Sequence, residues 1–289
     1  MCMNSYRRLI ILCLYSPAHA LEYVMDRSAQ LDTWVKLLPE DFSALWVIGD
    51  ETCNIPYLID KDLYVPCKDS NMMAKTALAI QFLWENFEFD YVLRSNTSTY
   101  FIFEKLQKVI SQMEKWGIEV AGFPMKVSFR NRGKIYCSGQ AILMSKNSSE
   151  LIIPSKDFIS TDPDDVTISY MLREMHNVMW FTRSDLELLP LWWPSSVVRL
   201  KHPTDSFETQ NSMRLMHDFV IAKGKASKAS RYFKVVSHSI QGFKPLKLSV
   251  HDWIQRVVIL MKTLLYIKGV SYTLALRYFV SRFVSKLED

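Results

Sequence analysis

Three groups of polar residues stand beside predicted strands and helices, in places where side chains could do chemistry. Asp50 follows one apolar run, residues 94–98 (Arg-Ser-Asn-Thr-Ser) follow another, and Asp162, Asp164 and Asp165 precede a helical stretch. An arginine can hold a phosphate in its two-pronged guanidinium, and a carboxylate can take a proton from a hydroxyl. Each group also has a structural explanation, because acidic residues before a helix can cap it and a polar run after a strand can be a loop.

The elements that would position these residues alternate along the first 180 residues. Apolar runs predict strands at 9–15, 44–48, 62–66, 89–93, 118–123, 141–144 and 178–183. Helical spacing predicts helices at 20–38, 72–87, 101–116 and 164–175. This alternation indicates an α/β fold with a mostly parallel central sheet flanked by helices. Ligands bind beyond the carboxyl ends of strands in such sheets, which is where the polar groups stand.

The composition is that of a folded protein. With 289 residues, 49% hydrophobic, 22% charged, 8 Gly and 11 Pro, the chain is not collagen-like, low in complexity or disordered. Its five cysteines have irregular spacings and form no C-x-x-C pair, so we expect neither a zinc cluster nor a redox motif. The prediction is reduced thiols in a cytoplasmic protein.

Residues 1–20 allow two interpretations. Arg7 and Arg8 precede the apolar run 9–15, and residues 18–20 (Ala-His-Ala) have the form of a signal-peptide cleavage site. A run of about seven apolar residues is at the lower limit for a signal peptide, and it also fits a first buried strand. The strand is the interpretation we prefer. No stretch approaches 18 uncharged apolar residues, so no membrane-spanning helix is expected.

Charge is distributed unevenly along the chain. The total net charge is +5, but residues 221–289 carry +10 and residues 1–220 carry −5. Two basic amphipathic helices are predicted within 246–289. Helices of this kind can lie in an anionic membrane surface, or they can cover the globular body. We therefore expect a domain at 1–220 and a basic amphipathic helical extension at 221–289.

Residues 62–103 carry four motifs in a characteristic order. They are Asp62-Leu-Tyr64, Lys75-Thr76, Trp84 within a predicted helix, and Tyr91-Val-Leu-Arg-Ser95. Their order resembles that of the beta-1,3-galactosyltransferase and Fringe type of glycosyltransferase (family 31). The resemblance implies a GT-A-like, Rossmann-type domain that transfers a sugar, with inversion, from a nucleotide-sugar donor to a hydroxyl.

Two later segments extend the resemblance. Ser138-Gly139-Gln140 leads into an apolar strand, as the family's Ser-Gly-Gly segment does, and Asp164-Asp165-Val166 corresponds to its Glu-Asp-Val. Order and spacing agree over about residues 9–200. The resemblance implies donor-binding roles for Ser138 and Gly139, and Asp50 is a further donor-binding candidate because it follows a strand.

The chain departs from the family at the acidic triplet that holds a divalent cation against the nucleotide diphosphate. Asn96, Thr97 and Ser98 stand in its place, and hard cations prefer carboxylate oxygen. Binding of Mn²⁺ or Mg²⁺ to the diphosphate is still an alternative, but the cation would lack the carboxylate ligands that the family supplies. Side-chain cations and amides could neutralise the diphosphate instead, with Arg94, Lys75, Asn96 and Ser98 as candidates. The other interpretation is a catalytically inactive module that binds a nucleotide or sugar.

The resemblance also suggests which residues would do the chemistry. Asp165 matches the family's carboxylate that takes the proton of the acceptor hydroxyl, and Asp164 would orient the acceptor. Both could instead cap the helix. We expect the helix N-terminus to lower the pKa of Asp165 and so keep it ionised.

A late basic segment, Arg199-Leu-Lys201-His202, corresponds to the late His that the family carries near its diphosphate, and the resemblance implies that it closes over the nucleotide. The expected acceptor is a glycan or a lipid-linked glycan in cell-surface polysaccharide synthesis. We expect a cytoplasmic location, with peripheral attachment of 246–289 to the inner face of the cell membrane. A nucleic-acid partner is not expected, because the basic tail contains no recognised binding motif.

Overall fold

The computed structural model describes residues 6–17, 21–126, 135–154, 163–172, 178–180, 197–199 and 206–221. Its strands are β1 (Arg7–Leu14), β2 (Phe42–Gly49), β3 (Tyr57–Ile59), β4 (Asp62–Val65), β5 (Phe89–Asn96), β6 (Thr99–Phe101), β7 (Val120–Lys126), β8 (Ile135–Ser145), β9 (Val178–Trp180) and β10 (Val197–Arg199). Its helices are α1 (Leu21–Asp32), a 3-10 turn η1 (Trp34–Leu37), α2 (Met72–Asn86), α3 (Phe103–Trp116), α4 (Lys146–Glu150), α5 (Asp164–Met171) and α6 (Ser206–Ile221).

The central sheet has eight strands in the order β3-β4-β2-β1-β5-β8-β7-β9, and β10 pairs with β6 in a separate ladder. Strands β4, β2, β1 and β5 are parallel neighbours, whereas β8 is antiparallel to both β5 and β7. Counted along the chain, the parallel strands are arranged 3-2-1-4, which is the order of a doubly wound α/β sheet. The fold is therefore the predicted α/β class with a mostly parallel sheet.

Strand β1 lies at the centre of this sheet and is buried on both faces. Leu9 to Leu14 are each at most 3% exposed, as expected for a parallel strand covered by helices on both sides. Leu9, Ile11 and Cys13 face one cluster of core residues, and the residues between them face the other. The run 9–15 thus forms the buried strand that we preferred in the sequence.

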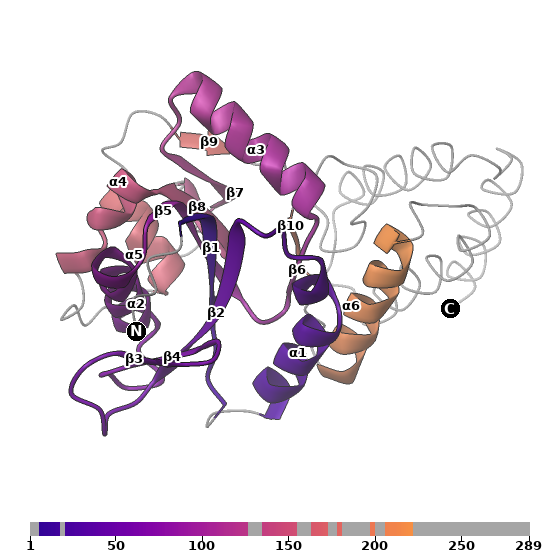
Figure 1. Ribbon diagram of the computed structural model, residues 1–289, viewed down its shortest axis with the longest axis horizontal. Coiled ribbons are helices and arrows are strands. Elements are labelled where there is room, and N and C mark those ends of the chain that lie inside the picture. Colours follow the sequence, from indigo (N-terminus) through magenta and orange to yellow (C-terminus); the bar gives the residue numbers. More distant parts are fainter. Residues whose placement is uncertain are drawn as a thin grey trace, which may run out of the picture.

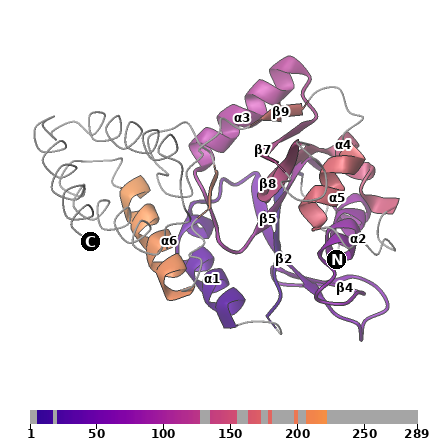
Figure 2. The ribbon, with the colours of Figure 1, turned by 180° about the vertical axis from the view of Figure 1, so that it is seen from behind.

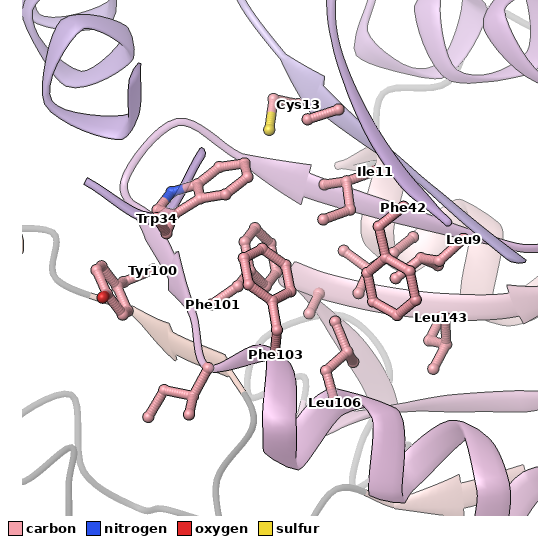
Figure 3. Packing of buried hydrophobic residues seen from close by; sticks show 14 of the residues in the cluster. Leu9, Ile11, Cys13, Trp34, Phe42, Tyr100, Phe101, Phe103, Leu106 and Leu143 are labelled. Atoms are coloured by element: carbon pink, nitrogen blue, oxygen red, sulfur yellow. The ribbon is translucent and has the colours of Figure 1, made fainter. Parts of the chain in front are cut away.

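Helices cover both faces of the sheet. Core contacts place α1, α3 and α6 on one face and α2 and α5 on the other. The two opposite views show α1 beside α6 on one side of the strands, and α2, α4 and α5 together on the other (Figures 1 and 2). The first face is rich in aromatic residues, where Trp34 packs edge-on against Phe101 with ring centroids 4.8 Å apart (Figure 3).

Local signals in the sequence account for several helix ends. The Asn71 side chain accepts a 3.1 Å hydrogen bond from the Ala74 amide and so caps α2. Helix α3 ends at Gly117, whose φ of 62° lies in the left-handed region that favours glycine. Helix α5 begins directly after Pro163, with two carboxylates in its first turn.

Several elements differ from those predicted. Strand β8 begins at Ile135 instead of 141, because residues 135–137 pair with residues 124–126 of β7. Helix α3 begins at Phe103 instead of 101, because residues 99–101 pair with β10. The predicted helix 20–38 ends at Asp32 and continues as η1. Strands β3, β6 and β10 and helices α4 and α6 were not predicted.

The predicted extension at 221–289 lies outside the described residues, apart from Ile221 at the end of α6. Within the part of the chain that the structure describes, no helix is both long enough and apolar enough to cross a membrane. The four cysteines in that part carry free thiols.

Candidate functional site

The carboxyl ends of β1, β2 and β5 meet at one edge of the sheet, and the strand order reverses between β1 and β5. Ligands bind at this reversal point in doubly wound sheets. The residues that follow the two strands there are Ser16, after β1, and Thr97 and Ser98, after β5. Arg94 of β5 donates a hydrogen bond to Asp164 in the first turn of α5. The structure therefore places two of the predicted polar groups, the end of β5 and the start of α5, at one location.

Arg94 lies at the centre of this location and is 3% exposed. Its Nε donates to Asp164 Oδ2 over 2.9 Å and its Nη2 to Asp164 Oδ1 over 2.7 Å. Its Nη1 donates to Asn96 Oδ1 over 2.9 Å and also to the Gly139 carbonyl. Arg94 and Asp164 thus form a buried ion pair. An arginine that follows a strand would ordinarily form a salt bridge at the surface.

Pleating of β5 explains why this side chain reaches α5. Val92, two residues earlier, packs in the core cluster on the α2 and α5 side, and successive side chains of a strand alternate between faces. Arg94 therefore points to that side, where Asp164 occupies the first turn of α5. Asp164 itself is 9% exposed, so both partners of the ion pair are removed from solvent.

Asp165 is half-buried beside this pair. Its Oδ2 accepts a 2.8 Å hydrogen bond from the Gly139 amide, and its Oδ1 accepts a 2.9 Å bond from the Val166 amide. Burial raises the pKa of Asp165, while Arg94 and the two amides oppose that rise. Our expectation of a lowered pKa was wrong, because the first turn of α5 packs against β8 and loses the solvent that would favour the charge.

Gly139 separates Arg94 from Asp165. A Cβ atom at this position would lie 2.4 Å from Arg94 Nη1 and 3.1 Å from Asp165 Oδ2. Only a residue without a side chain fits there without displacing the guanidinium. Ser138 and Gln140, its neighbours on β8, are both buried, and Gln140 offers its carbonyl to the Ser95 hydroxyl over 2.8 Å.

Lys75, in the first turns of α2, is fully buried. Its Nζ donates to the Tyr15 carbonyl over 2.9 Å and to Ser16 Oγ over 2.7 Å, and it forms an ion pair with Asp69. Burial lowers the pKa of Lys75, and Asp69 opposes this shift. Its ammonium therefore ties α2 to the end of β1, and it is not a solvated helix lysine.

The other predicted residues are more scattered. Asp50 accepts hydrogen bonds from the Thr52 amide, over 2.9 Å, and from the Tyr57 hydroxyl, over 3.1 Å. Those bonds shape the turn after β2 and lower the pKa of Asp50. Ser98 is 5% exposed. Lys201 and His202 lie outside the described residues.

Strand β10 brings Arg199, the first residue of the basic segment, to the same edge of the sheet. Arg199, its last residue, is paired with Thr99 in an antiparallel ladder. Thr99 lies three residues after Asn96, the last residue of β5, so the Arg199 backbone lies close to the end of β5. This pairing of backbones was not visible in the sequence, since neither strand is longer than 3 residues.

Two functional candidates were missed. Asp26 of α1 is 8% exposed, and its Oδ2 lies 3.4 Å from the Thr97 hydroxyl. Asp69 precedes α2 and binds both Lys75 and the Gly49 amide. Neither residue belongs to a motif, and a single carboxylate on an amphipathic helix or in a loop carries no signal by itself.

The residues in place of the acidic triplet do not fit a divalent cation. The Asn96 amide oxygen accepts a hydrogen bond from the Arg94 guanidinium, and the Thr97 hydroxyl faces Asp26. A fixed positive charge next to the Asn96 oxygen opposes a second cation there. Within the described ranges, no three His, Cys, Asp or Glu side chains gather in a metal-binding arrangement.

Comparisons with known proteins complete this description. No protein-family model matches the chain, and no curated protein matches its sequence. A 4-diphosphocytidyl-2C-methyl-D-erythritol synthase from Anaerococcus prevotii is similar at 11% identity and a TM-score of 0.40, over 61% of this chain and 86% of that one. A glycosyltransferase involved in glycosylation of the major capsid of PBCV-1 is similar at 11% identity and a TM-score of 0.42, over 72% of this chain and 99% of that one.

Proposed function

We propose that the chain is an inverting glycosyltransferase with a GT-A-like domain, which transfers a sugar from a nucleotide-sugar donor to the hydroxyl of a glycan or lipid-linked acceptor. The observation that carries the proposal is Asp165, a half-buried carboxylate held by two amides close to the reversal point of the sheet. The motif order that resembles family 31 supports the choice of sugar transfer over other reactions at such a site.

Asp165 would act as the general base. It accepts the proton of the acceptor hydroxyl while the hydroxyl oxygen bonds to the anomeric carbon and the bond from that carbon to the diphosphate breaks. Burial raises the pKa of Asp165, which makes its carboxylate a stronger base. The Gly139 and Val166 amides hold it in one orientation, so that a free lone pair can face the acceptor.

Donor binding would use residues around the same edge. Asp50, Ser98, Ser138 and Gly139 are the proposed contacts to nucleoside and sugar. Lys75 and Arg94 have carboxylate partners, so their charges are already compensated.

We therefore assign the direct neutralisation of the diphosphate to Arg199, Lys201 and His202. The pairing of Arg199 with Thr99, close to the end of β5, supports this assignment for Arg199.

The acceptor and the location are extensions of this proposal. We propose a role in cell-surface polysaccharide synthesis, in the cytoplasm, with residues 246–289 attached to the inner face of the membrane. Replacing Lys262, Lys268, Arg277 and Arg282 with Gln in the full chain should weaken co-flotation with vesicles rich in anionic lipid. Unchanged flotation would overturn the membrane attachment and leave sugar transfer unaffected.

A thermal-shift screen tests the donor class. UDP, GDP, CMP and their sugar conjugates are added to the full chain, with Mn²⁺ and separately with EDTA. A ligand at 100 times its dissociation constant adds about 2.7 kcal/mol to the free energy of unfolding, which is readily detected. A nucleotide-selective shift that survives EDTA supports a site without a metal, and no shift with any nucleotide contradicts the proposal.

Turnover tests the chemistry. Asp165→Asn should lower donor turnover by about 100- to 10,000-fold while nucleotide binding persists. Asp90→Asn, at the other end of β5 where Asp90 is exposed, is the matched control and should keep normal turnover.

The second candidate function is a catalytically inactive module that binds a nucleotide or sugar. The absence of a carboxylate at residues 96–98 favours it. Nucleotide-selective binding without turnover in the wild-type chain would establish this alternative.

A further inference from the structure

The contacts of Arg94 are all internal to the protein. Nε and Nη2 hold Asp164 at both carboxylate oxygens, and Nη1 faces the Asn96 side chain and the Gly139 carbonyl. At 3% exposure, the guanidinium has little surface left for a ligand. A direct contact with a phosphate would require it to release a buried carboxylate, which is costly.

Two routes connect this guanidinium to Asp165. The first runs through Gly139, whose carbonyl accepts from Arg94 while its amide donates to Asp165 Oδ2 over 2.8 Å. The second runs through Asp164, which precedes Asp165 in the first turn of α5 and accepts hydrogen bonds from Arg94 at both carboxylate oxygens. Arg94 therefore holds both the strand and the helix that orient the Asp165 carboxylate.

We propose that Arg94 is a positioning residue, which fixes the Asp165 carboxylate through Asp164 and Gly139 and does not bind the donor itself. The arrangement is tight, because even a Cβ atom on Gly139 would lie 2.4 Å from Arg94 Nη1. A misplacement of about 1 Å in a reacting group can lower a rate by roughly 100-fold. The catalytic consequence rests on the proposed function, whereas the positioning is a property of the fold.

The charges around Asp165 make the positioning measurable. The described titratable groups that face it are Arg94 from β5, Asp164 from its own helix and Cys137 from β8. Arg94 lowers the pKa of Asp165 and Asp164 raises it, with Arg94 the stronger influence. Removing Arg94 should thus raise the pKa of Asp165, and removing Asp164 should lower it.

The decisive experiment is a carboxyl titration by ¹³C NMR on the full chain, with the Asp165 signal assigned by its loss in Asp165→Asn. We expect Arg94→Gln to raise the pKa of Asp165 and Asp164→Asn to lower it. Shifts in the same direction, or no shift, would overturn the proposal. Arg8→Gln removes an ion pair with Glu114 near the start of β1, and should leave the titration unchanged.

A double variant provides the test if Arg94→Gln or Asp164→Asn does not fold. Arg94→Met combined with Asp164→Leu replaces the buried pair with apolar side chains, which proteins often tolerate. Because Asp165 loses both routes that orient it, kcat for sugar transfer should fall in this double variant as well. A folded double variant with an unchanged kcat would also overturn the proposal.

Kinetics separate positioning from donor binding. In Arg94→Gln, kcat for sugar transfer should fall about 100-fold, with little change in the KM for the donor. A rise in the donor KM with an unchanged kcat would overturn the proposal in favour of a phosphate contact. If the wild-type chain turns over no nucleotide sugar, the proposed function fails and the NMR titration still decides the role of Arg94.

Discussion

The ammonium of Lys75 on α2 donates a hydrogen bond of 2.7 Å to the hydroxyl of Ser16, the second residue after β1. The same ammonium binds the Tyr15 carbonyl and pairs with Asp69, and Asp69 accepts the Gly49 amide from the end of β2 over 3.0 Å. One buried cation thus joins a helix, a loop and the ends of two neighbouring strands. This connection shapes the edge of the sheet at which we place the donor.

Replacing Lys75 should therefore cost stability. Lys75→Met leaves the Asp69 carboxylate without its buried cation, and breaking a buried pair costs about 3–5 kcal/mol. Urea unfolding measures the loss. Lys108→Met removes an exposed pair with Glu104 and should cost about 0–1 kcal/mol. Equal losses in the two variants would mean that the Lys75 pair contributes no more than a surface contact.

A methyl group on Gly139 should disturb the site as well as the fold. Gly139→Ala forces the new Cβ against the Arg94 guanidinium, and overpacking of this kind costs about 1–3 kcal/mol. Gly117→Ala is the matched control, because it strains the left-handed end of α3 at a cost of about 1–2 kcal/mol but meets no atom within 4 Å. Both variants should lower the free energy of unfolding, and only Gly139→Ala should reduce donor turnover. A turnover loss in both would indicate a general effect of stability.

Gln30 should be needed to support the segment that follows β5. It is fully buried, accepts from the Trp46 indole over 2.9 Å, and donates to the Thr99 carbonyl over 3.3 Å. Gln30→Leu leaves the buried indole N–H unpaired, so it should cost about 1–3 kcal/mol in urea unfolding. Gln81→Leu, which removes an exposed contact on α2, should be close to neutral.

The docking of α6 should depend on pH. His217 lies 3.1 Å from the Tyr100 hydroxyl, and burial, the largest influence, lowers its pKa, although Asp218 opposes this. A lowered pKa favours the neutral ring in the folded state, so its contribution to stability is present above about pH 6.5 and is lost as the pH falls through the lowered pKa. Between about pH 7.5 and pH 5, the wild type should lose more unfolding free energy than His217→Gln. An identical loss in both would rule out His217 as the source.

Much of the fold could be predicted because its signals are local. The run around Leu9 to Leu14 is apolar enough to be buried on both faces, and its alternation with helical spacing indicated the α/β class. Strands of 3 residues, such as β6 and β10, escaped prediction because their existence depends on a partner distant in the sequence. The order of the motifs in the sequence resembles family 31, but no protein-family model matches the chain.

The sequence by itself determined which polar residues follow strands, the order of the motifs and the uneven charge of the chain. Only the tertiary structure decided what those residues do to one another. It paired Arg94 with Asp164, 70 residues away, and it buried Lys75 against Asp69. It also raised the pKa of Asp165 where the helix N-terminus alone predicted a lowered one. The physical reason is that burial and ion pairing depend on neighbours brought together by the sheet, and local sequence does not contain those neighbours.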